Sequence, residues 1–252
     1  MFGGSTNSRT FSRRSIHGQV AHDLGMRIVS GAFPPESILP NEENFSTELK
    51  VSRTVFREAI KVLAAKNLVE PRPKTGTRVC AAKEWNMLDP DVLAWCFSTG
   101  PSINQARSLY EMRNIVEPAA AAMAAERADA AQLIKIEAAL AAMEISEPDT
   151  DASINADLHF HQAIIEACGN DLLASLGYLI ESALEHSFKL SIQRPGARKN
   201  SIPLHTAVFT AIKERNPEQA KTAMNVLLGE AWGDLEDVIS ELPDKKPKTD
   251  IS

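Results

Sequence analysis

The chain has 252 residues, 44% of them apolar, which is enough for one large domain or two smaller ones with real cores. Its 27 Lys and Arg against 33 Asp and Glu give a net charge of −6, but residues 1–80 carry a net +5 and the remainder a net −11. A basic head before an acidic body predicts that only the head contacts a polyanion, which excludes a chain that binds nucleic acid along its whole length.

Two short helices are predicted at the start of the head, after a polar tail. Residues 1–15 are polar and contain three arginines, so they predict a flexible tail. A first helix is predicted at about residues 17–30, where a glycine and two prolines end it. A second helix begins after Asn41, a typical N-cap, and its first turn holds Glu42 and Glu43, which suit the positive end of a helix.

The most informative stretch of the head is the next predicted helix, residues 52–63. Ser52 is a typical N-cap, and apolar residues recur at helical spacing along one face. Arg53 and Arg57 project together from the opposite face, where guanidinium groups suit phosphate oxygens or the edge of guanine. Solvated surface arginines are the simpler interpretation of this helix alone. The tight turn at Lys50 favours a helix-turn-helix whose second helix reads DNA.

A β-hairpin, or wing, is predicted to follow at residues 69–79 with a glycine in its turn. Arg72, Lys74 and Arg78 give this wing three positive charges suited to phosphates beside the groove. Residues 16–80 are therefore predicted to form a winged helix-turn-helix. The predicted DNA contacts on the helix and the wing are Ser52, Arg53, Thr54, Arg57, Arg72, Lys74, Thr75, Gly76 and Thr77.

Beyond residue 81 the strand signals stop and the sequence becomes a series of helices. Predicted helices, separated mostly by Gly, Pro and Asp signals, span residues 89–97, 102–128, 129–145, 151–168, 171–193, 202–215 and 217–240. We expect residues 81–100 to form a linker with a first helix, 101–242 an all-α antiparallel bundle, and 243–252 a flexible tail. The predicted fold class is mainly α: a winged helix-turn-helix with a small β-hairpin, followed by a helical bundle.

The bundle contains one polar constellation that suits a ligand. Asp157 and His161 are four residues apart and share a helical face, and a carboxylate with an imidazole suits Zn²⁺, Mn²⁺, Ni²⁺ or a hydroxy-acid. A plain Asp–His hydrogen bond inside a bundle is the alternative. A third ligand would come from another helix, and His186 and His205 are the two histidines placed to supply it.

A single arginine interrupts the apolar face of the predicted helix at 102–128. Arg113 points inward there, and an inward arginine needs an anion. Glu117, one turn further on, and the carboxylate of a ligand are the two alternatives.

Export and membrane insertion have no signal in the sequence. No apolar run approaches the roughly 18 residues of a membrane span, and the N-terminal residues lack the apolar core of a secretory signal. Cys80, Cys96 and Cys168 lie at neither metal-binding nor redox spacing. We therefore expect a cytoplasmic protein with reduced, buried thiols.

Head and bundle together resemble the GntR family of transcriptional regulators, in the FadR subfamily with an FCD domain. The head carries the family pattern at residues 28–31, 39–40, 51–60, 63 and 76–77, and the bundle carries it at residues 113–118, 124–128, 157–161 and 205–212. Residues 85–95 are similar to the branch that contains the galactonate-operon repressor. The resemblance spans roughly residues 15–240.

For the head, the resemblance implies a homodimer on a palindromic operator, with one recognition helix in each major groove. It implies that Arg53 and Arg57 contact DNA and that the wing around Gly76 lies along the minor groove. Family members often have arginine at the position of Glu43. A glutamate cannot make their phosphate contact, so operator preference does not carry over from them.

For the bundle, the resemblance implies metal ligands at Asp157, His161 and His205, with Arg113 binding the carboxylate of an effector. The family pattern adds a histidine 22 residues after His205, and this chain has Leu227 there. We expect three protein ligands completed by effector oxygens, with Glu230 as a substitute ligand. The alternative is an effector bound without metal.

The sequence therefore predicts a ligand-responsive transcriptional repressor of a catabolic operon, released by a small carboxylate such as a sugar acid. A metal-dependent enzyme built on Asp157, His161 and His205 is a weaker alternative, because the chain has no HExxH, GxGxxG or P-loop motif and an enzyme does not explain the basic head. An architectural DNA-binding protein without effector is a third, and the polar residues inside the bundle argue against it.

Overall fold

The computed structural model describes residues 15–148, 150–191 and 197–241, so the predicted tails at 1–15 and 243–252 lie outside it except for Ser15, which caps α1. The described chain is mainly helical with one small hairpin, as predicted. It divides into two compact units at Gly100 and Pro101. Among the helices of the described ranges, none has both the length and the apolar character of a membrane span.

The first unit is a winged helix-turn-helix, which confirms the predicted fold of the head. Its elements are α1 (Ile16–Val29), α2 (Glu42–Glu48), α3 (Arg53–Ala65), β1 (Val69–Arg72), β2 (Gly76–Val79), the 3₁₀ turn η1 (Ala82–Glu84) and α4 (Pro90–Ser98). The antiparallel hairpin pairs Val69 with Val79 and Arg72 with Gly76. Phe45 of α2 stacks on Phe56 of α3 with ring centroids 5.4 Å apart, and both rings are buried.

Local rules explain how the elements of this unit begin and turn. The Ser52 hydroxyl accepts a hydrogen bond from the Val55 N–H, which caps α3. Asn41 caps α2 in the same way. Lys50 takes a φ of +53° in the turn between α2 and α3, and Gly76 takes +98° in the turn of the wing. The positive φ at the wing favours glycine, which has no Cβ.

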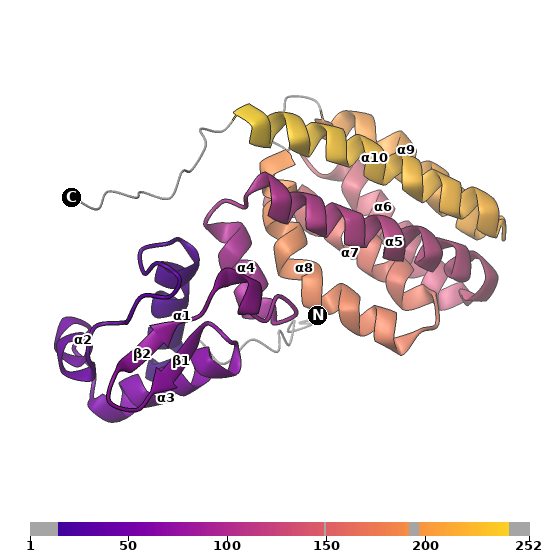
Figure 1. Ribbon diagram of the computed structural model, residues 1–252. Coiled ribbons are helices and arrows are strands. Elements are labelled where there is room, and N and C mark those ends of the chain that lie inside the picture. Colours follow the sequence, from indigo (N-terminus) through magenta and orange to yellow (C-terminus); the bar gives the residue numbers. More distant parts are fainter. Residues whose placement is uncertain (1–14, 149, 192–196, 242–252) are drawn as a thin grey trace. The chain divides into compact units, whose positions relative to one another are not determined.

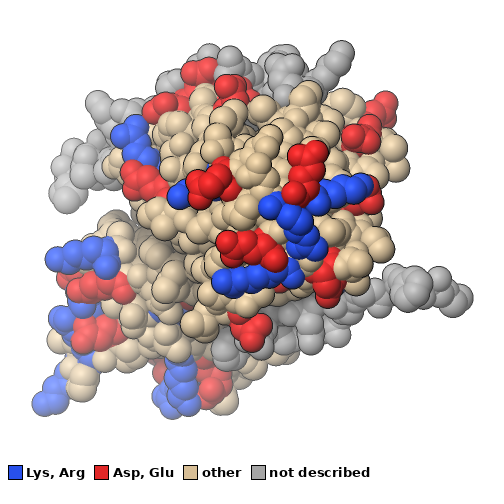
Figure 2. Space-filling view, turned by 90° about the vertical axis from the view of Figure 1, so that its right-hand side faces the viewer, with Lys and Arg blue, Asp and Glu red and all other residues tan. Residues whose placement is uncertain are grey.

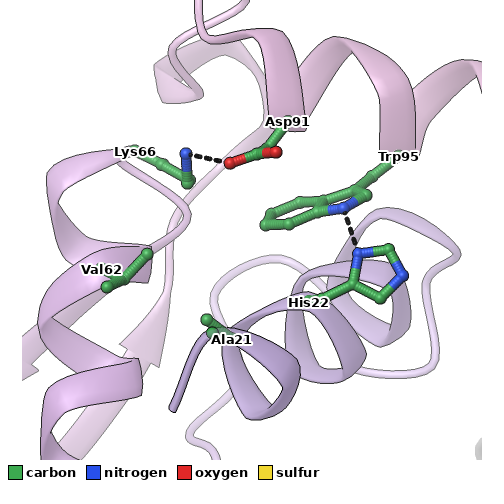
Figure 3. A pocket seen from close by; sticks show the side chains of 7 residues that line it. Ala21, His22, Val62, Lys66, Asp91 and Trp95 are labelled. Atoms are coloured by element: carbon green, nitrogen blue, oxygen red, sulfur yellow. Dashed lines mark hydrogen bonds and ion pairs between the residues drawn. The ribbon is translucent and has the colours of Figure 1, made fainter. Parts of the chain in front are cut away.

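Helix α4 packs against the winged helix-turn-helix through a buried polar junction (Figure 3). Lys66, after the end of α3, places its ammonium 2.8 Å from carboxylate oxygens of both Asp89 and Asp91. The Trp95 indole donates a hydrogen bond of 2.7 Å to His22 Nδ1 on α1. The expected linker region therefore contributes a docked helix to the first unit.

The second unit is an all-α bundle of six helices within the described residues (Figure 1). They are α5 (Ile103–Arg127), α6 (Ala130–Ile145), α7 (Asp151–Ala167), α8 (Asp171–Ser191), α9 (Ala197–Lys213) and α10 (Pro217–Glu241). Helix α10 lies along both α5 and α9, and α7 lies along α6 and α8. Their shared core includes Ile136, Phe160, Val208, Ile212 and Leu228.

One predicted boundary in the bundle is wrong. Helix α9 begins at Ala197 rather than at residue 202. The prediction placed Pro203 in the first turn, where a missing N–H costs nothing. In the structure Pro203 lies inside the helix, where proline cannot donate the backbone hydrogen bond to the residue four positions earlier.

The three cysteines are free and buried, as predicted. Burial raises the pKa of the Cys96 thiol to about 11 and also raises the pKa values of Cys80 and Cys168.

Candidate DNA interface and metal centre

The predicted recognition helix α3 presents its two arginines to solvent. The side chains of Arg53 and Arg57 are 64% and 68% exposed. Opposite them, Phe56, Ala59 and Leu63 are buried in the core. This orientation leaves both guanidinium groups accessible to a groove of DNA.

Both arginines pair with glutamates of α2, which the sequence analysis did not predict. Arg53 Nη2 lies 3.3 Å from Glu43 Oε1, and Arg57 Nε donates a hydrogen bond of 2.9 Å to Glu42 Oε2. The sequence predicts for both glutamates only a favourable interaction with the N-terminus of α2. The helix-turn-helix geometry was the available signal, because it brings the first turn of α2 beside the first turns of α3.

Two of the three predicted cations of the wing are exposed. Arg72 and Lys74 are exposed, together with Thr75 and Gly76, and Thr77 is half-buried. Arg72 pairs with Glu70.

Arg78 differs from these wing residues, because its side chain is only 13% exposed and meets Glu36, Glu70 and Glu84. The hydrogen bonds that Arg78 donates to Glu36 and Glu70 raise the pKa of its guanidinium. The expectation that Arg78 offers its charge to phosphates is therefore wrong, and its role is to hold the wing to the preceding loop.

The same pairing of opposite charges recurs elsewhere on the chain. On the face drawn in Figure 2, Lys and Arg side chains lie directly beside Asp and Glu side chains. Lys213 pairs with Glu137 in this way, and Arg107 pairs with Glu236. On this face, the described residues therefore show charges of both signs side by side.

Three of the predicted ligand residues meet inside the bundle. Asp157 and His161 come from α7, and His205 comes from α9. Asp157 Oδ1 lies 3.2 Å from Nε2 of each histidine. One ligand atom from each residue falls within 4.8 Å of the others, and all three residues are withdrawn from solvent. His205, the third ligand that the resemblance to the family implies, thus lies beside the pair on α7.

The hydrogen-bond partner of Nδ1 in each histidine determines whether Nε2 of the same ring carries a proton. His205 Nδ1 lies 2.8 Å from the Ser201 carbonyl oxygen, which only accepts hydrogen bonds, so this nitrogen carries the proton. His161 Nδ1 faces Glu117 Oε2 at 2.6 Å, outside good hydrogen-bond geometry, and the carboxylate again favours a protonated Nδ1. In neutral rings, both Nε2 atoms are then bare acceptors.

Three lone pairs consequently converge, because the Asp157 carboxylate oxygen faces two acceptor nitrogens. Such a cluster needs extra protons or a cation. Two ligands about 2.0–2.1 Å from a tetrahedral Zn²⁺ are about 3.3 Å apart. The distance from Asp157 Oδ1 to Nε2 of each histidine, 3.2 Å, is close to this separation. Two imidazoles and one carboxylate, each imidazole oriented by an oxygen behind it, therefore fit a divalent metal.

The electrostatics of the cluster agree with a site built for positive charge. Burial would raise the pKa of Asp157, but His205 and His161 outweigh it and hold that pKa well below its usual value. Burial would lower the pKa of His161, but Glu117 and Asp157 raise it to about 9. The carboxylates therefore attract either protons on the imidazoles or a metal in their place.

Glu117 connects the cluster to Arg113. Arg113 Nε donates a hydrogen bond of 2.6 Å to Glu117 Oε1. Of the two alternatives for the anion beside this inward arginine, the structure therefore shows Glu117. Burial would raise the pKa of Glu117, but Arg113 and His161 lower it to about 2. Helical spacing predicts the pair of Glu117 with Arg113, but it does not predict the contact of Glu117 with His161, which joins α5 to α7.

Of the other positions that the sequence singled out, the structure places the side chains of Glu230 and Leu227 outside the cluster. Glu230 is exposed on α10, so its expected role as a substitute ligand is wrong. Leu227 is 3% exposed and packs in the bundle core. His186 lies on α8, and its side chain falls outside the described residues.

Comparisons with known proteins match both units. Residues 16–79 match the family model of bacterial regulatory proteins of the gntR family, and residues 108–230 match that of the FCD domain. The chain is 32% identical over 216 residues to the galactonate operon transcriptional repressor of Escherichia coli K12, covering 85% of this chain and 94% of that protein. It is 29% identical over 226 residues to the Glc operon transcriptional activator of the same organism, covering 84% and 85%.

Solved structures support the fold. The Listeria monocytogenes protein Lar aligns with a TM-score of 0.65 at 21% identity, covering 89% of this chain and 98% of that chain. The E. coli protein McbR/YncC aligns with a TM-score of 0.51 at 18% identity, covering 88% and 98%. At these identities the likeness establishes a shared fold alone.

Proposed function

We infer, from the premise that the chain belongs to the gntR family of bacterial regulatory proteins and carries an FCD domain, that this transcriptional regulator represses a catabolic operon until a small carboxylate releases it. A sugar acid is the proposed effector class, because the galactonate operon repressor is 32% identical to this chain. The observation that carries the effector proposal is the convergence of Asp157, His161 and His205 on one point.

In the proposed complex with DNA, α3 enters the major groove and Arg53 and Arg57 reach base edges or phosphates. A homodimer would place two such helices about 34 Å apart on a palindromic operator. Bacterial DNA lies in the cytoplasm, and the proposal places the protein there. The other proposed contacts to the sugar-phosphate backbone are Ser52, Thr54, Arg72, Lys74, Thr75, Gly76 and Thr77.

In the proposed effector site, a divalent ion such as Zn²⁺, Mn²⁺ or Ni²⁺ is held by Asp157 Oδ1 and by Nε2 of His161 and His205. When bound, the ion supplies positive charge and open coordination positions for carboxylate and hydroxyl oxygens of the effector. Arg113 keeps its pair with Glu117 and offers its remaining terminal nitrogen to the effector carboxylate. Residues 16–80 then serve as the DNA-binding domain and residues 101–242 as the effector-binding and dimerisation domain.

Release from DNA requires that the effector bind one dimer geometry more tightly than another. A coupling free energy of about 1–3 kcal/mol would change operator affinity by roughly 5–150-fold. This is the size of effect that a binding assay must resolve.

The test starts with an operator duplex selected by the wild-type protein from a random-sequence library. Sugar acids are then screened for a rise in Tm, and each hit is added to the protein–operator complex in a band-shift titration. We expect at least one sugar acid to raise Tm and to weaken operator binding at least about 5-fold. His159→Ala is the matched control for His161→Ala, because His159 is exposed on the same helix and outside the cluster.

Three outcomes separate the parts of the proposal. Loss of the response in His161→Ala but not in His159→Ala supports the effector site. A hit that raises Tm without changing operator affinity contradicts release by the effector. Failure of the wild-type protein to enrich any sequence contradicts the DNA-binding function itself.

A further inference from the structure

The ion pairs between α2 and α3 place negative charge beside the groups proposed to read DNA. Glu43 lies in the first turn of α2, and its side chain is 76% exposed beside that of Arg53. Glu42 is more enclosed, at 28% exposure, and holds Arg57 through Nε. The two arginines of the recognition helix are therefore each accompanied by a carboxylate of the neighbouring helix.

The pair with Glu43 leaves most of the Arg53 guanidinium available. The contact involves one terminal nitrogen, Nη2, at 3.3 Å from Glu43 Oε1. A guanidinium has five N–H donors, so one carboxylate contact leaves donors for a second partner. Arg53 can consequently bind a base edge while it stays paired with Glu43.

A phosphate and a guanine edge differ as second partners. The O6 and N7 atoms of guanine are neutral acceptors, and a nearby carboxylate does not repel them strongly. A phosphate carries a full negative charge. If it bound the same guanidinium as Glu43, the carboxylate would repel it. Glu43 should therefore weaken phosphate contacts by Arg53 more than base contacts.

We propose that Glu43 is a specificity-determining residue that directs Arg53 to base edges and opposes its use as a phosphate contact. This rests on the proposed function, because it presumes that α3 reads an operator. The effect lowers binding to DNA of arbitrary sequence, which depends almost wholly on phosphate contacts. Glu43 thus increases the ratio of operator affinity to non-specific affinity without touching a base.

The test compares Glu43→Gln with wild type on two DNA probes: the duplex selected by the wild-type protein, and poly(dA-dT), which has neither an operator nor an O6/N7 acceptor edge. Exposed ion pairs are worth about 0.2–1 kcal/mol, so we expect poly(dA-dT) affinity to rise about 1.5–5-fold. Affinity for the selected duplex should rise less or fall. The salt dependence on poly(dA-dT) should steepen by about one counterion if Arg53 gains a phosphate.

Glu48→Gln is the matched control, because it also removes one negative charge from α2. Glu48 pairs with Arg27 on α1 and not with the recognition helix. Equal effects of the two variants on both probes would overturn the proposal, since they would reflect net charge alone. Circular dichroism and urea unfolding verify that both variants are folded.

A double-mutant cycle with Arg53→Ala assigns the effect to the ion pair. In the Arg53→Ala background, Glu43→Gln should no longer change the ratio of the two affinities. An unchanged effect of Glu43→Gln in that background would contradict a role through Arg53. If the wild-type protein selects no duplex at all, the proposed DNA-binding function fails first, and this outcome is distinct from failure of the Glu43 proposal.

Discussion

Replacement of Lys66 by methionine should strongly destabilise the first unit. The Lys66 side chain is 6% exposed, and its ammonium neutralises Asp89 and Asp91, whose side chains are 19% and 8% exposed. Methionine fills a similar volume but leaves two largely buried carboxylates without a counter-charge. Loss of one partner of a buried ion pair typically costs about 3–5 kcal/mol, and we expect Lys66→Met to lower the free energy of unfolding by that amount.

The assay is urea unfolding followed by tryptophan fluorescence in a Trp232→Phe background. The remaining tryptophans, Trp85 and Trp95, then report on the first unit, which avoids treating two units as one transition. Lys61→Met is the matched control: the Lys61 side chain is 72% exposed beside Glu58, so loss of this solvent-screened pair should leave the free energy of unfolding almost unchanged. A loss below about 1 kcal/mol for Lys66→Met would refute the argument that this junction depends on buried charge.

Three further predictions test other parts of the structure. Gly25→Ala should destabilise the first unit by about 1–3 kcal/mol in the same urea assay, because the added Cβ would overlap the Trp95 ring; stability equal to wild type would contradict this packing. The native protein should react only slowly with Ellman's reagent at pH 8, because a pKa near 11 keeps Cys96 protonated and all three thiols are buried; a rapid stoichiometric phase would disprove it. Arg53→Ala should weaken operator binding by about 1–3 kcal/mol in a band-shift assay if Arg53 reads a base. If Arg53 binds only phosphate, the loss should be smaller and equal on all DNA sequences. Unchanged operator binding would show that Arg53 does not contact DNA.

Features set by neighbouring residues were predicted well from the sequence. The cap at Ser52, the glycine turn of the wing and the break near Gly100 each follow from the chemistry of one or two residues. The start of α9 was missed because a proline is acceptable both in a first turn and, at a cost, inside a helix. Local rules alone do not decide between these placements.

Contacts between distant elements were predicted less well. Arg53 and Arg57 find their partners on α2 because α2 and α3 pack against each other. Residue spacing along the chain does not give the distance between side chains of two packed helices. The docking of Lys66 on α4 was missed for the same reason. The Asp157–His161 pair followed from helical periodicity, whereas the choice of His205 over His186 needed the family resemblance.

The proposed metal centre is the claim on which effector control depends, and metal analysis tests it most directly. Wild-type protein purified without chelator should contain about one divalent ion per chain by elemental analysis, because three lone pairs converge at Asp157, His161 and His205. His161→Ala should lose this ion, and His159→Ala should retain it. A wild-type protein that is metal-free, and that takes up no Zn²⁺, Mn²⁺ or Ni²⁺ on dialysis, would contradict the proposed centre.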